Sequence, residues 1–129
     1  MRAEELKGHL DAVLLAALEG GPRHGYAVIE SLRQSTGGQL DLPTGTIYPA
    51  LRRLEQAGLI AGTWSVVGGR RRREYRLTPA GVRALSGRRA AWRDFSATVT
   101  AALESAARVN AALGNAALED TACPSPNPA

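Results

Sequence analysis

Residues 66–78 read VVGGRRRREYRLT: two glycines and four consecutive arginines, followed by an alternation of charged and apolar residues. The residues before the glycines, 59–67, are mostly β-branched, small or aromatic. Two such runs on either side of a Gly-Gly pair predict a β-hairpin with the arginines held at its tip. Tyr75 and Leu77 share one face of the return strand. We expect Trp64 to face inward with them, so that this face of the hairpin packs on neighbouring helices.

Three amphipathic helices are predicted before the hairpin. Apolar residues recur at helical spacing over residues 6–18, and the sequence Gly20-Gly21-Pro22 ends this first helix. A second helix begins near Gly25 and stops at Gly37-Gly38. The third helix follows after a short polar connection.

The third helix is predicted over residues 44–57, with Gly58 at the position that follows a helix end. A proline in a helix interior costs about 3 kcal/mol, because it removes a hydrogen bond and clashes with the preceding turn. We therefore expect Pro49 to lie within the first turn, with the helix cap at Thr44 or Thr46.

A long helix is predicted after the hairpin, with Thr78 as its N-cap and Pro79 as its first residue. Its apolar residues form a heptad-like stripe, which polar residues weaken at the second heptad position. The stripe follows a small domain that already has its own core, so we expect it to pair with a second copy. The residues that recur every seven positions are Leu85, Trp92, Val99, Ala106 and Leu113.

The predicted fold is mainly α with a small antiparallel β-hairpin: a winged helix-turn-helix followed by a long C-terminal dimerisation helix. The expected parts are a DNA-binding domain over residues 1–78, the dimerisation helix over residues 79–118, and a tail over residues 119–129. The tail is polar and rich in proline, which favours disorder.

The net charge of +4 is unevenly distributed along the chain. Residues 44–93 contain eleven arginines and only two acidic residues, Glu55 and Glu74, and therefore carry +9. The remaining residues carry about −5. A basic segment between acidic surroundings is typical of a surface that docks a polyanion.

No catalytic or metal-binding constellation is visible in the sequence. His9 and His24 fall in different helices without a second ligand four residues away, and Cys123 has no cysteine partner. Nucleophile-elbow and phosphate-loop motifs are absent, and no run of about 18 apolar residues could span a bilayer. The sequence therefore predicts a cytoplasmic protein that is not an enzyme, uses no cofactor and has no membrane partner.

The third helix and the arginine run are the predicted DNA-binding surface. Short hydroxyls and an aromatic ring at an exposed helix start suit base edges, and arginines suit phosphates. Two alternatives remain open: an ordinary capped surface helix beside a solvated loop, or a winged-helix module that binds protein without specific DNA binding. The candidate DNA-binding residues are Thr44, Thr46, Tyr48, Pro49, Arg52, Arg53, Arg70, Arg71, Arg72 and Arg73.

The chain resembles the PadR family of bacterial transcriptional regulators over about residues 6–110. The resemblance rests on His24-Gly25-Tyr26, PTGTIYPALRRLEQAGLI, Trp64, the Gly-Arg-rich turn, REYRLTPAG and Trp92. It implies a dimeric winged helix-turn-helix repressor with its third helix in the major groove of operator DNA and its hairpin near the flanking backbone. The reading positions of the family correspond to Thr44, Thr46, Tyr48 and Arg52.

The short C-terminal part is similar to the compact PadR subfamily, which has a single dimerisation helix. Some members of that subfamily bind flat aromatic drugs between paired tryptophans at the dimer centre, which implies a planar aromatic effector near Trp92. The alternative is that Trp92 only packs in the dimer interface. The residues expected at the dimer interface or ligand site are Leu85, Trp92, Phe95, Val99 and Leu103.

Overall fold

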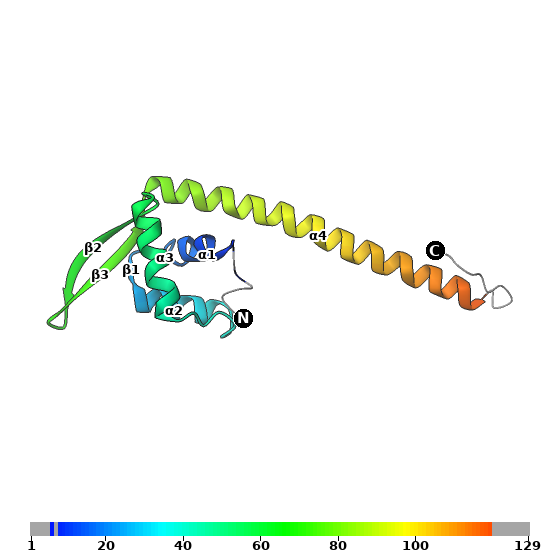
Figure 1. The fold of residues 1–129 in the computed structure, drawn as a ribbon, viewed down its shortest axis with the longest axis horizontal. Helices are drawn as coiled ribbons and strands as arrows, with labels where there is room; N and C mark the ends of the chain where they lie inside the picture. The colour runs from blue at the N-terminus through cyan, green and yellow to red at the C-terminus, as the bar shows by residue number, and fades with distance from the viewer. Residues whose placement is uncertain (1–5, 7, 120–129) are drawn as a thin grey trace. The chain divides into compact units, whose positions relative to one another are not determined.

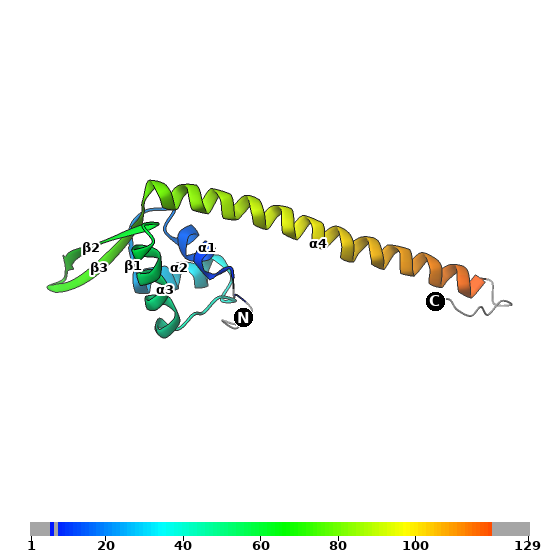
Figure 2. The ribbon, with the colours of Figure 1, turned by 45° about the horizontal axis from the view of Figure 1, so that its top comes forward.

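The computed structural model describes residue 6 and residues 8–119 and confirms the predicted fold class (Figures 1 and 2). The chain divides into two compact units, Met1–Arg89 and Ala90–Ala129, so the division falls inside the long helix. Apart from residue 119, the predicted disordered tail lies outside the described residues. The elements in chain order are α1 (Leu10–Ala17), β1 (Arg23–His24), α2 (Gly25–Ser35), α3 (Thr44–Gln56), β2 (Ile60–Val67), β3 (Arg70–Leu77) and α4 (Pro79–Glu119).

The first helix is shorter than predicted. Leu6 is buried, as its place in the apolar pattern requires, but it lies in a turn that precedes α1. The amide of His9 donates to the carbonyl of Leu6 at 2.8 Å, and Gly8 between them has a φ of 89°, outside the helical region. A turn thus places Leu6 in the core where the sequence pattern had indicated another helical turn.

The arginine run lies in a strand and not at the hairpin tip. Only Gly68 and Gly69 form the turn, with φ values of 59° and 78°, as a two-residue type I′ turn requires. Val67 consequently pairs with Arg70, and the register continues to Ile60 opposite Leu77. Because the glycines alone close the hairpin, all four arginines are paired along β3 and have defined directions.

A third strand, β1, was not predicted from the sequence. Its two residues pair with β3, Arg23 opposite Tyr75 and His24 opposite Glu74, and the sheet order is β1-β3-β2. A strand of two residues is too short to show a sequence period, so only its backbone pairing reveals it.

The expectation that Pro49 lies in the first helical turn was wrong. Helix α3 begins at Thr44 with Pro43 as its N-cap, which makes Pro49 the sixth helical residue. The Pro43 carbonyl accepts hydrogen bonds from Thr46 (2.9 Å) and Ile47 (3.1 Å), whereas the Gly45 carbonyl has no donor at position 49. Burial of the apolar face of α3 compensates for this loss. The buried residues of that face are Ile47, Ala50, Leu51 and Leu54.

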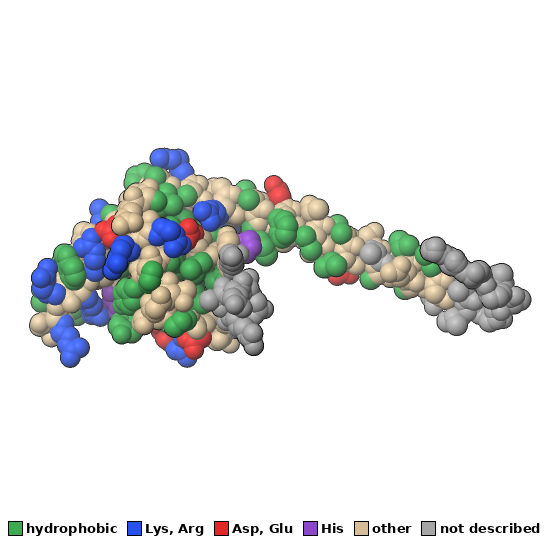
Figure 3. Space-filling view, in the orientation of Figure 1, with side chains coloured by type: hydrophobic (Ala, Val, Ile, Leu, Met, Phe, Trp, Pro, Cys, Tyr) green, Lys and Arg blue, Asp and Glu red, His purple; other side chains and the backbone are tan. Residues whose placement is uncertain are grey.

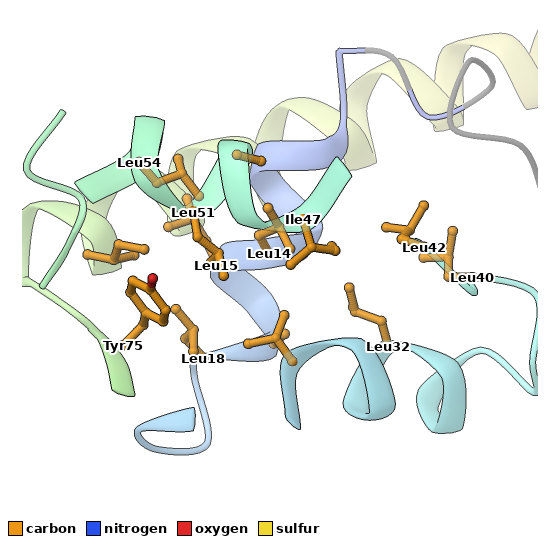
Figure 4. Close-up of a cluster of buried hydrophobic side chains, with 14 of the residues drawn as sticks. Leu14, Leu15, Leu18, Leu32, Leu40, Leu42, Ile47, Leu51, Leu54 and Tyr75 are labelled. Carbon is orange, nitrogen blue, oxygen red and sulfur yellow. The ribbon is translucent and has the colours of Figure 1, made fainter. Parts of the chain in front are cut away.

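The core of the first unit is built from leucines of α1, α2, α3 and the connection between α2 and α3, with Tyr75 from the sheet (Figure 4). Leu14, Leu15 and Leu51 have no exposed surface. Leu85 of α4 is also part of this core and is 3% exposed. This corrects the assignment of Leu85 to the dimer interface: the start of α4 packs on its own domain, and the heptad pattern by itself does not distinguish the two environments.

Helix α4 is joined to the rest of the first unit by polar contacts around its N-cap. The Thr78 hydroxyl accepts from the amide of Gly81 (3.1 Å), which confirms the predicted cap, and donates to the Gly58 carbonyl (2.6 Å). Farther along α4, Arg89 donates two hydrogen bonds of 2.7 Å to Glu19, and these bonds lower the pKa of the Glu19 carboxyl. Arg89 interrupts the apolar stripe because it makes this ion pair.

Within residues 6 and 8–119, no helix is long and apolar enough to cross a membrane. The same residues contain no group of three or more histidine, cysteine or acidic side chains that could hold a metal ion.

Gly81 should tolerate no side chain, because a Cβ at this position would overlap the carbonyl oxygen of Leu59. We expect Gly81→Ala to lower the free energy of unfolding by about 1–3 kcal/mol, the usual range for overpacking against atoms that cannot move. Urea denaturation followed by circular dichroism measures this. Gly87→Ala is the control: it lies on the same helix with open space at its Cβ, and it should be neutral or stabilising. If the two variants have the same free energy of unfolding, Gly81 does not pack closely against the Leu59 carbonyl.

Candidate nucleic-acid interface

A recess of about 850 Å³ lies between α3, the start of α2 and the β2–β3 hairpin, all within the first unit. Figure 3 shows Lys and Arg side chains gathered over the hairpin. The recess combines aromatic rings with guanidinium groups, the two kinds of side chain that contact nucleic acids through stacking and phosphate binding. Its lining includes Tyr26, Tyr48, Trp64, Tyr75, Arg52, Arg70, Arg71, Arg72, Arg73, His24 and Glu55. We call it the α3–hairpin recess.

Strand alternation divides the four arginines of β3 between the two faces of the hairpin. Trp64 pairs with Arg73, and Val66 pairs with Arg71, so these residues share one face. The guanidinium carbons of Arg71 and Arg73 lie 4.6 and 5.3 Å from the centre of the Trp64 ring, within the range of cation–π contacts. Trp64 lies on the same face as Tyr75 and Leu77, as predicted, but it is 58% exposed and contacts arginines, so the expectation that it packs inward was wrong.

Arg73 joins the hairpin to α3 through an ion pair with Glu55, and neither side chain is more than 30% exposed. Glu55 accepts a hydrogen bond from Arg73 and thereby raises the pKa of the guanidinium. Since this charge is already paired, Arg73 is suited to holding the hairpin beside α3 more than to binding an anion. Glu55 was not among the predicted site residues, because only the packing of the hairpin against α3 brings it to Arg73.

Arg72 lies on the opposite face of the hairpin and contacts His24, with 2.9 Å between Nη1 and Nε2. His24 Nδ1 accepts from the amide of Ala27 at 3.3 Å, which caps α2 and leaves the proton of a neutral ring on Nε2. In addition, Arg72 Nε is buried without a hydrogen-bond partner within the described part of the chain. Arg72 is therefore poorly satisfied where it lies.

The predicted reading residues of α3 do not all share one environment. Arg52 is exposed and lines the α3–hairpin recess, whereas Arg53 binds Asp11 of α1 at 2.5 Å. Thr44 and Pro49 are exposed, and Thr46 is half-buried; none of these three lines the recess.

Tyr48 is half-buried and packs against the start of α2. A Cβ at Gly25 would lie 2.5 Å from the Tyr48 ring, and Tyr26 meets the same ring edge-on at 6.3 Å between centroids. Burial raises the pKa of Tyr48, and the neighbouring Tyr26 and Tyr75 raise it further. The structure thus brings Tyr26, a residue absent from the predicted site, beside the tyrosine that was expected to read DNA.

The second unit presents apolar side chains along α4. Trp92 and Phe95 are 51% and 59% exposed in the single chain, and their ring centroids lie 6.0 Å apart at 38°. Val99 and Leu103 continue this exposed surface at 38% and 67%. These four residues are the part of the predicted dimer or ligand site that remains accessible, and we call them the α4 apolar face.

Comparison with known proteins relates the chain to bacterial regulators. The family model of the transcriptional regulator PadR-like family matches residues 14–87. A transcriptional regulator of Mycobacterium tuberculosis is 42% identical over 77 residues, which are 60% of this chain and 59% of that protein.

Solved structures show the same relationship. A PadR family transcriptional regulator from Eggerthella lenta has a TM-score of 0.70 and 34% identity, covering 79% of this chain and 88% of that one. Bacillus subtilis PadR, solved in complex with operator DNA, has a TM-score of 0.57 and 25% identity, covering 62% of this chain and 46% of that one. The matched family region contains α2, α3, the sheet and the first turns of α4, and the chain belongs to the PadR-like family of transcriptional regulators.

Proposed function

We propose that the chain is a cytoplasmic, sequence-specific DNA-binding repressor that acts as a homodimer and is released by a small molecule. The observation that carries this proposal is the α3–hairpin recess, in which exposed arginines and aromatic rings lie beside the helix expected to read DNA. The Bacillus subtilis relative solved with operator DNA supports it. The family is one of transcriptional regulators, and we propose no catalytic role.

In this proposal the start of α3 enters the major groove, where Thr44, Thr46 and Tyr48 face base edges. Arg52, Arg70 and Arg71 are exposed and face the phosphates on either side. We propose that Arg53 and Arg73, which form ion pairs with Asp11 and Glu55, position α3 and the hairpin. Arg72 is half-buried beside His24, and we propose that it contributes less than Arg70 and Arg71.

The arginines of the hairpin should separate into those that bind phosphate and those that position the hairpin. We expect Arg70→Ala combined with Arg71→Ala to reduce the slope of log affinity against log salt by about 0.9 for each phosphate that is no longer neutralised. Fluorescence anisotropy with duplex DNA over a salt series measures the slope. Arg33→Ala with Arg108→Ala removes the same charge outside the recess and should leave the slope nearly unchanged. An identical slope in both double variants would exclude the hairpin arginines from the interface.

The α4 apolar face is proposed to bind the same face of a second chain. Large apolar side chains repeat along it at coiled-coil spacing, and burying them in a dimer would remove them from water. Two chains would present two copies of α3, so the operator should be a pseudo-palindrome with half-sites about one helical turn apart. The proposed parts are then a DNA-binding domain over residues 1–78 and a dimerisation helix over residues 79–118.

Charges on the α4 apolar face should abolish dimerisation. We expect Val99→Glu with Leu103→Glu to give a monomer by sedimentation velocity and to weaken operator binding by about 100-fold or more, because the second half-site no longer binds intramolecularly. Ala101→Glu, on the opposite side of the helix, is the control and should remain dimeric. A double variant that stays dimeric would place the interface elsewhere.

A second candidate function is a protein-interaction module. The hairpin exposes Trp64 and Val66 at 58% and 69%, and such apolar side chains favour contact with a protein surface. DNase footprinting on the promoter region of its own gene separates the two functions. A protected site supports DNA binding, whereas no protection together with salt-independent capture of a protein partner supports the module.

The proposed effector is a planar aromatic molecule that binds at Trp92 between the two chains and changes the spacing of the two α3 helices. We expect such compounds to quench tryptophan fluorescence, because aromatic stacking places them against the indole. Trp92→Ala should abolish the quenching, whereas Trp64→Phe removes the other of the two tryptophans and should preserve it. Absence of quenching in the unmodified chain over a broad panel would leave Trp92 a packing residue of the dimer.

A further inference from the structure

The tripeptide His24-Gly25-Tyr26 forms the start of α2 and has no role in the contacts proposed above. Its three residues make three different contacts. His24 caps the helix by accepting the amide hydrogen of Ala27, and it also ends β1 through its pairing opposite Glu74. The first turn of α2 is therefore fixed by the capping hydrogen bond and by the pairing of β1 with β3.

Gly25 provides the space in which the Tyr48 ring lies. A Cβ at position 25 would be 2.5 Å from two ring carbons and the hydroxyl oxygen of Tyr48, far inside van der Waals contact. Tyr48 is consequently fixed between α3 and α2 and is only partly exposed. In this location Tyr48 supports the ring of Tyr26, in addition to the base contact proposed for it above.

Tyr26 is the exposed member of the aromatic pair. It is 66% exposed, its ring meets Tyr48 edge-on at 78°, and it lines the α3–hairpin recess together with Arg52 and the arginines of β3. A tyrosine hydroxyl is a neutral hydrogen-bond donor, and phosphate oxygens are frequent acceptors for tyrosine in protein–DNA complexes. Tyr26 is thus an exposed neutral donor in a recess that several guanidinium groups line, a setting that suits an anion.

We infer that Tyr26 donates a hydrogen bond from its hydroxyl to a backbone phosphate of bound DNA, and that Gly25 and Tyr48 act as positioning residues for it. This inference rests on the proposed function and adds a contact from α2. The surrounding positive charge favours a phosphate over a base edge. The contact is independent of sequence, and it releases no counterion because tyrosine is neutral.

The test uses duplex DNA selected from a random pool and, separately, unselected random duplex. We expect Tyr26→Phe to weaken binding to both DNAs by the same factor, about three- to tenfold for each protomer that contacts the DNA, as for the loss of one hydrogen bond per protomer. The salt slope should not change. Ser31→Ala removes a hydroxyl from the same helix outside the recess and should bind both DNAs like the unmodified chain.

Further variants separate the hydroxyl from the ring. If Tyr26→Ala weakens binding and Tyr26→Phe does not, Tyr26 only packs on Tyr48 and the inference is overturned. A loss with Tyr26→Phe on selected DNA alone would make Tyr26 a base contact and would also overturn it. Gly25→Ala should displace Tyr48 and weaken binding to both DNAs while the circular dichroism spectrum stays that of the folded chain; unchanged binding would remove the positioning role.

The proposed function and this inference fail in different ways. If no sequence is enriched from the random pool, specific DNA recognition is excluded, but Tyr26→Phe must still weaken binding to random duplex. If the unmodified chain enriches a sequence and Tyr26→Phe binds it equally well, the proposed function is supported and the phosphate contact of Tyr26 is overturned. A chain that binds neither DNA overturns both.

Discussion

The backbone of Leu59 is the constraint on which the arrangement of the first unit depends. Its amide donates to the Leu54 carbonyl at 3.0 Å and ends α3, and its carbonyl accepts from the amide of Thr78 at 3.1 Å where β3 passes into α4. Gly81 packs against the same carbonyl. One residue therefore joins the end of the proposed reading helix, the base of the hairpin and the start of the long helix.

The α3–hairpin recess contains one ion pair, and a second ion pair fixes the start of α4. Glu55 and Arg73 hold the hairpin against α3, and Arg89 holds the first turns of α4 against Glu19. Exposed ion pairs add little to stability singly, so their value here is geometric. The Glu55–Arg73 pair holds the hairpin beside α3, and the DNA contacts proposed for Arg52, Arg70 and Arg71 require that placement.

Much of the fold could be predicted from the sequence, because the turn residues, helix caps and apolar periods that specify it are local. The glycine turn of the hairpin, the Thr78-Pro79 helix start and the apolar period of α3 each depend on residues within a few positions of one another. The predictions failed where a distant partner decided the outcome. Burial of the apolar face of α3 keeps Pro49 inside a helix, a turn places Leu6 in the core without a helix, and β1 exists only through its pairing with β3.

By itself, the sequence determined the order of the four helices and the hairpin, the basic segment and the family resemblance, because composition, turn residues and helix caps act over short distances. Only the tertiary structure decided what each arginine does. Four adjacent arginines are equivalent in the sequence, but strand pairing directs alternate side chains to opposite faces. On one face Arg73 pairs with Glu55, and on the other Arg72 contacts His24. The same holds for Tyr26, whose position beside Tyr48 exists only after α2 and α3 have packed together.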